Sequence, residues 1–171
     1  GYGYIGINAG KVKDVNIRRA IMYCMDVGLC LDYYGGSTFA SILNRSMSKN
    51  SWAYPEGCLP YYAEFSYDCE YDGAGNISKV GKFNDKLAMN SAKAAVGEAG
   101  YNTLDPKTGK LKNANGETLT FTFTIAGDSN DHPAYATMQK AANLLNEIGF
   151  DVTVTKDASA LSKLASGGLT V

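Results

Sequence analysis

The chain has 171 residues, of which 45% are hydrophobic and 19% are charged, with a formal net charge of −1. Sixteen basic against seventeen acidic side chains leave no basic surplus, which disfavours a protein that tracks nucleic-acid phosphates. No apolar run reaches the roughly 18–20 residues of a membrane span. The composition therefore predicts one globular domain with a sizeable core.

Both ends of the sequence resemble points at which a longer chain has been cut. A strand-like run opens at Gly1, and the last residues, "SGGLTV", stop as another strand begins. We therefore expect residues 1–171 to be a single partial domain from a longer protein. The first residues contain no signal peptide and indicate no compartment.

The first predicted elements are a strand and two helices. Residues 2–8 are aromatic and β-branched between Gly and Asn, which predicts a strand. Asp14 is a good N-cap for a helix whose apolar residues recur at spacings of three and four. These residues are Ile17, Ala20, Ile21 and Cys24. Asp26 is expected to cap a second short helix, 27–34, which Gly35-Gly36 ends.

Residues 37–83 are rich in Ser, Asn, Gly, Pro and Tyr and have no sustained period, which predicts a long Tyr/Gly-rich loop insertion. Its acidic residues fit no Ca²⁺-loop frame, so we interpret them as solvated surface. Its aromatic residues could line a recognition surface or pack the loop on the core, and both interpretations stay open. These residues are Trp52, Tyr54, Tyr61, Tyr62, Tyr67 and Tyr71.

The second half of the chain predicts a β-α-β unit. A helix with an alanine face ends at Gly100, and residues 119–125 then alternate cleanly as a half-buried strand. A helix begins near Pro133 and ends at Gly149, and residues 150–155 alternate again. The two strands should be parallel with a right-handed crossover. Asp157 is expected to cap a last helix with Leu161 and Leu164 on its buried side.

The four cysteines follow no CxxC pattern, and the chain has one histidine, which disfavours a zinc site. Cys24 and Cys30 lie in an apolar helical context and are expected to act as small buried hydrophobes. Cys58 and Cys69 lie in a polar aromatic segment and could form a disulfide in an exported protein, although spacing alone shows no pairing. Gly1, Gly3 and Gly6 make no dinucleotide fingerprint, because no helix opens after them.

The stretch "TFTIAGDSNDHP", residues 122–133, holds the candidate site residues. One hypothesis is a serine esterase or lipase-like hydrolase with Ser129 as nucleophile and His132 as base. Against it, the histidine of a triad generally comes from another loop. The plainest interpretation is a polar loop with Asp131 as the helix N-cap. A third interpretation places Asp128, Ser129, Asn130 and His132 in a binding cleft, because ligands of α/β domains gather at the carboxyl ends of parallel strands.

Three segments carry a family resemblance. "YIGINAGKVKDVNIRRAIMYCMD" (4–26), "SAKAAVGEAGY" (91–101) and "LTFTFTIAG…AANLLNEIGFDVTV" occur in this order. They resemble segments of the large family-five solute-binding proteins of ABC transporters, which bind oligopeptides, dipeptides or nickel. In that family a strand that ends in Phe-Asn or Ile-Asn is followed by the motif "D-V-R-V-R-x-A-I" and by a helix that contains Ala-Ile-Asp. The first segment is similar to this arrangement. The matching residues are Ile7-Asn8, Asp14-Val15, Ile17-Arg18, Ala20-Ile21 and Met25-Asp26.

The resemblance covers nearly the whole chain and departs from the family at Lys11-Val12-Lys13, which stands where the family has Pro-Phe, and at Asn16. It implies an α/β fold: a periplasmic-binding-protein-like lobe (type II, cluster C style), with a mixed sheet, the β-α-β unit and flanking helices. The chain would be most of the second lobe, with residues 4–8 at the hinge and His132 as the best ligand-binding candidate.

The resemblance also implies a function. The protein would be a substrate-binding component of an ABC importer, capturing oligopeptides by lobe closure for a membrane permease. No catalysis, cofactor or metal is expected. The full-length protein would be extracellular or periplasmic, tethered to the membrane as a lipoprotein.

Overall fold

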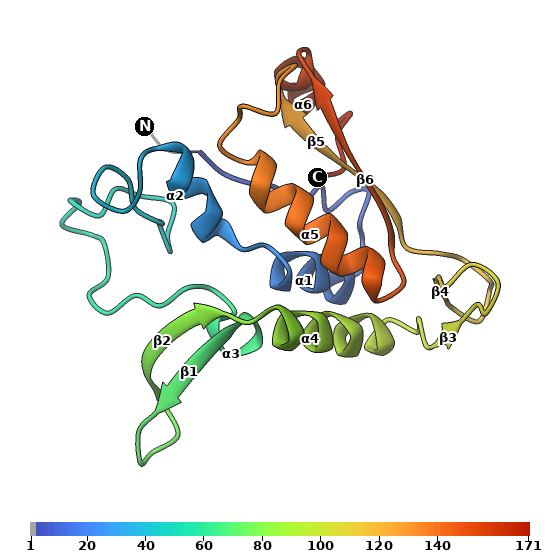
Figure 1. Cartoon of the computed structure of the whole chain (residues 1–171), viewed down its shortest axis with the longest axis horizontal. Helices are drawn as coiled ribbons and strands as arrows, with labels where there is room; N and C mark the ends of the chain where they lie inside the picture. Colours follow the sequence, from blue (N-terminus) through green and yellow to red (C-terminus); the bar gives the residue numbers. More distant parts are fainter. Residues whose placement is uncertain (1–2) are drawn as a thin grey trace.

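A computed structural model describes residues 3–171 (Figure 1). The first half contains four short helices and an antiparallel strand pair: α1 (Val15–Tyr23), the 3-10 helix η1 (Val27–Leu29), α2 (Cys30–Tyr33), α3 (Ala63–Ser66), β1 (Tyr67–Tyr71) and β2 (Ile77–Phe83). The second half contains the longer elements: α4 (Asp85–Glu98), β3 (Thr103–Leu104), β4 (Leu111–Lys112), β5 (Thr120–Ala126), α5 (Tyr135–Glu147), β6 (Asp151–Asp157) and α6 (Ala160–Ala165).

Within residues 3–171 the strands form three two-stranded sheets. β1 pairs with β2 and β3 with β4 in antiparallel fashion, whereas β5 and β6 are parallel, in register from Thr120↔Asp151 to Ala126↔Asp157. The predicted α/β class and the parallel pairing of the β-α-β unit are therefore confirmed. The connecting helix α5 packs against both of these strands.

The core lies between α1, α4, α5 and the parallel strands. Its largest fully buried side chains include Phe123, Phe150, Ile21 and Leu145. α1 packs against α4. The buried face of α4 carries small residues such as Ala88, which let the two helices approach closely. This places α5 between the helical layer and the parallel strands (Figure 1).

The strand predicted for residues 2–8 is wrong for the part that the structure describes, because residues 3–8 join no sheet, and residue 2 lies outside the described residues. Ile5 and Ile7 pack against the core without a strand partner. The segment is held instead by Asn8, whose backbone N–H donates to Thr170 O at 2.9 Å. The Asn8 amide also donates to Leu169 O at 3.0 Å, so side-chain contacts replace a ladder.

The 37–83 segment contains regular structure that the sequence analysis did not predict. Residues 67–83 form the β1–β2 hairpin, which projects from the body of the molecule (Figure 1). Its turn is held by Asp72, whose carboxylate accepts from the backbone N–H groups of Ala74 and Asn76. Tyr67, Cys69 and Tyr71 alternate with the acidic residues Asp68 and Glu70, which is a short strand signal that the sequence analysis did not use.

The last helix also differs from expectation. α6 begins only at Ala160, because Asp157 is still the last residue of β6. This start turns Ala160 inward and leaves Leu161 73% and Leu164 46% exposed. The prediction that both leucines lie on the buried side is therefore wrong.

The four cysteines are free thiols in the structure. Cys24 is fully buried, and this burial raises the pKa of its thiol to about 12. The Cys30 Sγ lies 3.3 Å from the hydroxyl of Thr137. The Sγ atoms of Cys58 and Cys69 contact different backbone carbonyls, those of Asn44 and Ala63.

Candidate ligand-binding edge of the parallel strands

The ends of β5 and β6 bring two loops together. Because the strands are parallel and in register, Ala126 and Asp157 end them at the same edge of the sheet. The N–H of Gly127 donates to the carbonyl of Asp157 at 3.1 Å and joins the two exits. We call residues 127–133 and 156–159 the carboxyl edge.

The loop after β5 is shaped by its own polar side chains. Gly127 has a φ of 146°, a left-handed value that favours glycine, and the chain turns there. The Ser129 Oγ accepts from the N–H of Asp131 at 3.0 Å. The His132 Nδ1 accepts from the N–H of Ala134 at 3.1 Å. These contacts fix the path of the loop into α5.

The residue at the start of α5 corrects one prediction. The N-cap position is occupied by Ala134, and its side chain can accept no hydrogen bond. Asp131, the expected N-cap, lies outside the helix and contributes its backbone N–H to Ser129. His132 takes the capping role in part, because its carbonyl accepts from the N–H of Tyr135.

All four predicted site residues lie in this one loop. Asp128, Ser129 and Asn130 are exposed, and His132 is half-buried. The structure adds Lys156 to them, because its Nζ donates to the Oδ1 of Asn130. The sequence analysis missed Lys156, although its place near the end of a strand parallel to 119–125 was a usable signal.

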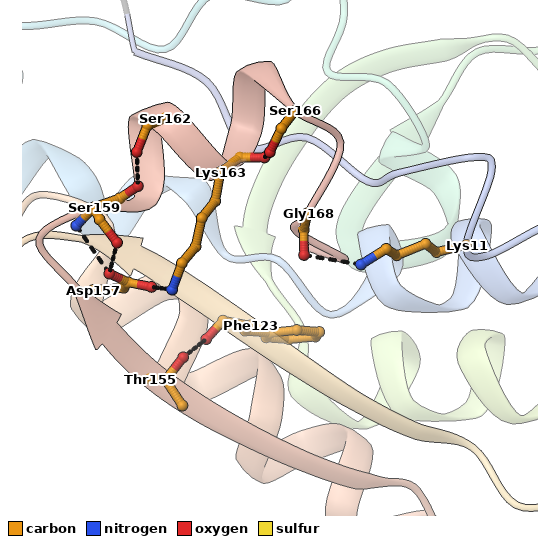
Figure 2. A network of polar contacts seen from close by, with 9 residues as sticks. All are labelled: Lys11, Phe123, Thr155, Asp157, Ser159, Ser162, Lys163, Ser166 and Gly168. Carbon is orange, nitrogen blue, oxygen red and sulfur yellow. Dashed lines mark hydrogen bonds and ion pairs between the residues drawn. The ribbon is translucent and has the colours of Figure 1, made fainter.

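Asp157 is the centre of a second polar network at the carboxyl edge (Figure 2). Its carboxylate pairs with the ammonium of Lys163 and accepts from the hydroxyl and N–H of Ser159. These contacts, that with Lys163 foremost, lower the pKa of Asp157 to about 2. The negative charge of Asp157 is therefore balanced within the chain.

The contacts of Ser129 do not form a nucleophile–base pair. Ser129 and His132 are each bonded to a backbone N–H, and the described residues show no hydrogen bond between them. Residues 3–171 also hold no group of three or more His, Cys, Asp or Glu side chains placed to bind a metal ion. No helix in this part of the chain is both long and apolar enough to cross a membrane.

Two surface hollows lie elsewhere on the molecule. One, of about 590 Å³, follows α4 near Tyr101, and the other, of about 380 Å³, lies in the 44–58 segment near Tyr54. Neither includes a residue of the carboxyl edge. Most side chains of the carboxyl edge loop after β5 are exposed and polar, with His132 half-buried.

The sequence matches no protein-family model and no curated protein. Solved structures do match. The oligopeptide-binding protein AppA of Bacillus subtilis, solved with a nonapeptide, is 20% identical over 94% of this chain, with a TM-score of 0.58. NikA of Brucella suis, solved with Fe(III)-EDTA, is 17% identical over 96% of this chain, with a TM-score of 0.55.

A third match is the oligopeptide-binding protein of Thermus thermophilus, solved with a pentapeptide. It is 17% identical over 95% of this chain, with a TM-score of 0.56. The chain covers only 27%, 28% and 24% of these three proteins. It therefore has the α/β fold of part of the periplasmic-binding-protein-like structures and spans about a quarter of their length.

Proposed function

We propose that this chain is most of the second lobe of a solute-binding protein that captures oligopeptides for an ABC importer. The main support is the match of 94% of the chain to part of an oligopeptide-binding protein, AppA. The motif order of the sequence points to the same family. In this proposal the two lobes close on the ligand by a hinge motion, residues 4–8 lie at the hinge, and the closed protein delivers its ligand to the permease.

The carboxyl edge is the part of this lobe that would face the ligand. Asp128, Ser129, Asn130 and His132 would hydrogen-bond to it directly or through water, which suits a site that accepts many side chains. No bond of the ligand is made or broken, and no cofactor takes part. A single lobe offers half of a cleft, so the isolated chain should bind peptides weakly.

The proposal includes a place in the cell. The full-length protein would be exported, extracellular or periplasmic, and held at the membrane as a lipoprotein beside its permease subunits. The 37–83 segment would be an insertion on the second lobe. The β1–β2 hairpin, which projects from the body, fits that description (Figure 1).

The test is calorimetric titration of the two-lobed protein that contains this chain. Mixed di- to pentapeptides should release heat, whereas short sugars should not. A nickel chelate belongs in the series because NikA was solved with a metal chelate. Silence with every peptide, or heat with the chelate or sugar alone, would overturn the peptide assignment.

A fluorophosphonate probe tests the rival hydrolase. We expect no labelling of Ser129, because its oxygen contacts a backbone N–H and its neighbour His132 is engaged with Ala134. A Ser129→Ala variant serves as the control for labelling at other serines. Labelling that disappears in this variant would show an activated nucleophile and replace the proposed function.

A further inference from the structure

The loop of residues 44–58 is a closed unit that is held together by its own hydrogen bonds. The backbone N–H of Asn44 donates to the hydroxyl of Tyr54 at 3.1 Å, and the Asn44 side-chain amide donates to the carbonyl of Cys58 at 2.9 Å. The two ends of the loop therefore meet, as they do in an Ω-loop. The carbonyl of Ser51 accepts from the N–H of Tyr54 at 3.0 Å and closes a turn inside the loop.

Trp52 is the side chain that this inner turn presents to solvent. It is 97% exposed, and it is the only tryptophan of the chain. Tyr54, two positions later, is half-buried and uses its hydroxyl within the loop. The loop thus turns one aromatic side chain inward and the other outward. An indole in water forgoes the free energy that burial of its apolar surface would give, and contact with another surface would recover it.

The wider segment 33–61 has the same character. It exposes six of the large hydrophobic side chains: Tyr33, Tyr34, Phe39, Trp52, Leu59 and Tyr61. Its only charged residues are Arg45, Lys49 and Glu56, which are all exposed and leave a net charge of +1. The segment lies at the end of the molecule opposite to β3 and β4 (Figure 1). An exposed apolar surface with little charge marks a contact with a protein or a membrane.

Two features favour a membrane over a protein partner. The residues that flank Trp52 and are exposed with it, Asn50 and Ala53, are small, so they offer little of the contact ring that surrounds a tryptophan in a protein interface. Arg45 and Lys49 are exposed basic residues of the same loop, and neither forms an ion pair among residues 3–171. Tryptophan and tyrosine concentrate at the headgroup level of a bilayer, and basic residues are attracted to anionic lipid there.

We propose that the 44–58 loop docks on a lipid bilayer that contains anionic lipid, with the indole of Trp52 in the interfacial layer and Arg45 and Lys49 against the headgroups. The loop backbone stays at the headgroup level, where water satisfies its N–H and C=O groups. The inference goes beyond the proposed function, because peptide capture needs no contact between this lobe and lipid.

The test uses the fluorescence of Trp52, which as the only tryptophan reports on this loop alone. The 171-residue chain is mixed with vesicles of phosphatidylcholine, or of phosphatidylcholine with about a quarter phosphatidylglycerol. The emission should shift to shorter wavelength with the anionic vesicles, and bromine-labelled lipid should quench it. Vesicle sedimentation measures the affinity of the same chain and of its variants.

Matched variants separate insertion of the indole from general stickiness. Trp52→Ala should weaken binding about tenfold or more, the size expected for losing a large buried aromatic group. Leu161→Ala removes another exposed hydrophobic side chain, on α6, and should leave binding unchanged.

Three further variants test the charges of the loop. Arg45→Gln and Lys49→Gln should each weaken binding to the anionic vesicles about fivefold. Glu56→Gln should strengthen it, because it removes the one acidic side chain of the loop. Lys107→Gln, at an exposed position before β4, should have little effect.

Each result decides the inference. The absence of an emission shift with both kinds of vesicle would overturn it, and so would binding that survives Trp52→Ala. An emission shift that grows with chain concentration in the absence of vesicles would show that a second copy covers Trp52, and would also overturn it. Peptide calorimetry is a separate measurement, so the proposed function stands or fails independently of these results.

Discussion

The ammonium of Lys140 lies 2.9 Å from the Oδ2 of Asp26. It also lies 2.9 Å from the Oδ1 of Asp85 and 4.7 Å from the ring centre of Phe83. Lys140 thus joins α5 to the chain after α1 and to the start of α4. Burial alone would lower the pKa of Lys140, but the hydrogen bonds with Asp26 and then Asp85 raise it above its ordinary value.

Lys140→Met should lower the free energy of unfolding by about 1–2 kcal/mol. The reason is that the variant removes the ion-pair partner of Asp26, whose side chain is only 15% exposed, a case between exposed and fully buried pairs. Urea denaturation measures the change. Lys93→Met, at an exposed position of α4, should change stability by less than about 0.5 kcal/mol. Equal effects of the two variants would contradict the structural role of the pair.

Gly149→Ala should be among the more damaging single-methyl additions. Gly149 has a φ of 113°, and an added Cβ would lie 2.8 Å from the Leu111 Cγ and 3.0 Å from the Leu111 N. Strain and overpacking together should cost about 3 kcal/mol in thermal or urea unfolding. The matched control is Gly116→Ala, since Gly116 has a φ of 76° and open space around it. It should cost about 1 kcal/mol, and an equal loss in both variants would rule out the clash.

The carboxyl carbon of Asp157 should titrate with a midpoint of about pH 2 in ¹³C NMR. Its pKa in the folded protein lies below the ordinary value of 3.8. The stabilising contribution of its contacts is therefore present above pH 3.8 and lost as the pH falls through about 2. Lys163→Gln should move the midpoint upward, toward 3.8, whereas Lys156→Gln should move it less. An unchanged midpoint in the Lys163 variant would contradict the ion pair of Figure 2.

Leu161→Ala should change the unfolding free energy by less than about 0.5 kcal/mol, because the side chain is 73% exposed. The same substitution at the fully buried Leu145 should cost about 2–5 kcal/mol. Chemical denaturation of both variants in parallel checks the contrast. A large loss of unfolding free energy in Leu161→Ala would contradict the exposed position and support the buried side chain predicted from the sequence.

The β-α-β unit could be predicted because its signals are local. Residues 119–125 alternate, Gly149 ends the helix in a left-handed conformation, and residues 150–155 alternate again, where the structure has β5 and β6. The residues 2–8 show where such signals fail. Aromatic and β-branched residues favour an extended chain, but only a neighbouring strand makes that chain part of a sheet, and no local pattern reveals the neighbour.

The candidate loop could be found for the same reason, since it follows a clear strand. What the sequence could not reveal is how its side chains are used. Asn130 and Lys156 are 26 positions apart and meet only because β5 and β6 are in register. The helix starts after Ala134 rather than after Asp131 because Ser129 and His132 form hydrogen bonds with backbone N–H groups of the loop. Residue type alone does not reveal these contacts.

The hydrogen bonds of Asn8 have a consequence for the order of folding. Its amide donates to the carbonyl of Leu169 across 161 positions. Lys11 donates to the carbonyl of Gly168 across 157 positions, a contact that Figure 2 shows. Closing a loop of nearly the whole chain carries a large entropic cost, so these bonds should form after the helices and the β5–β6 pair have condensed. The bonds of Asn8 would then be the last to form during refolding, and their appearance would report completion of the domain.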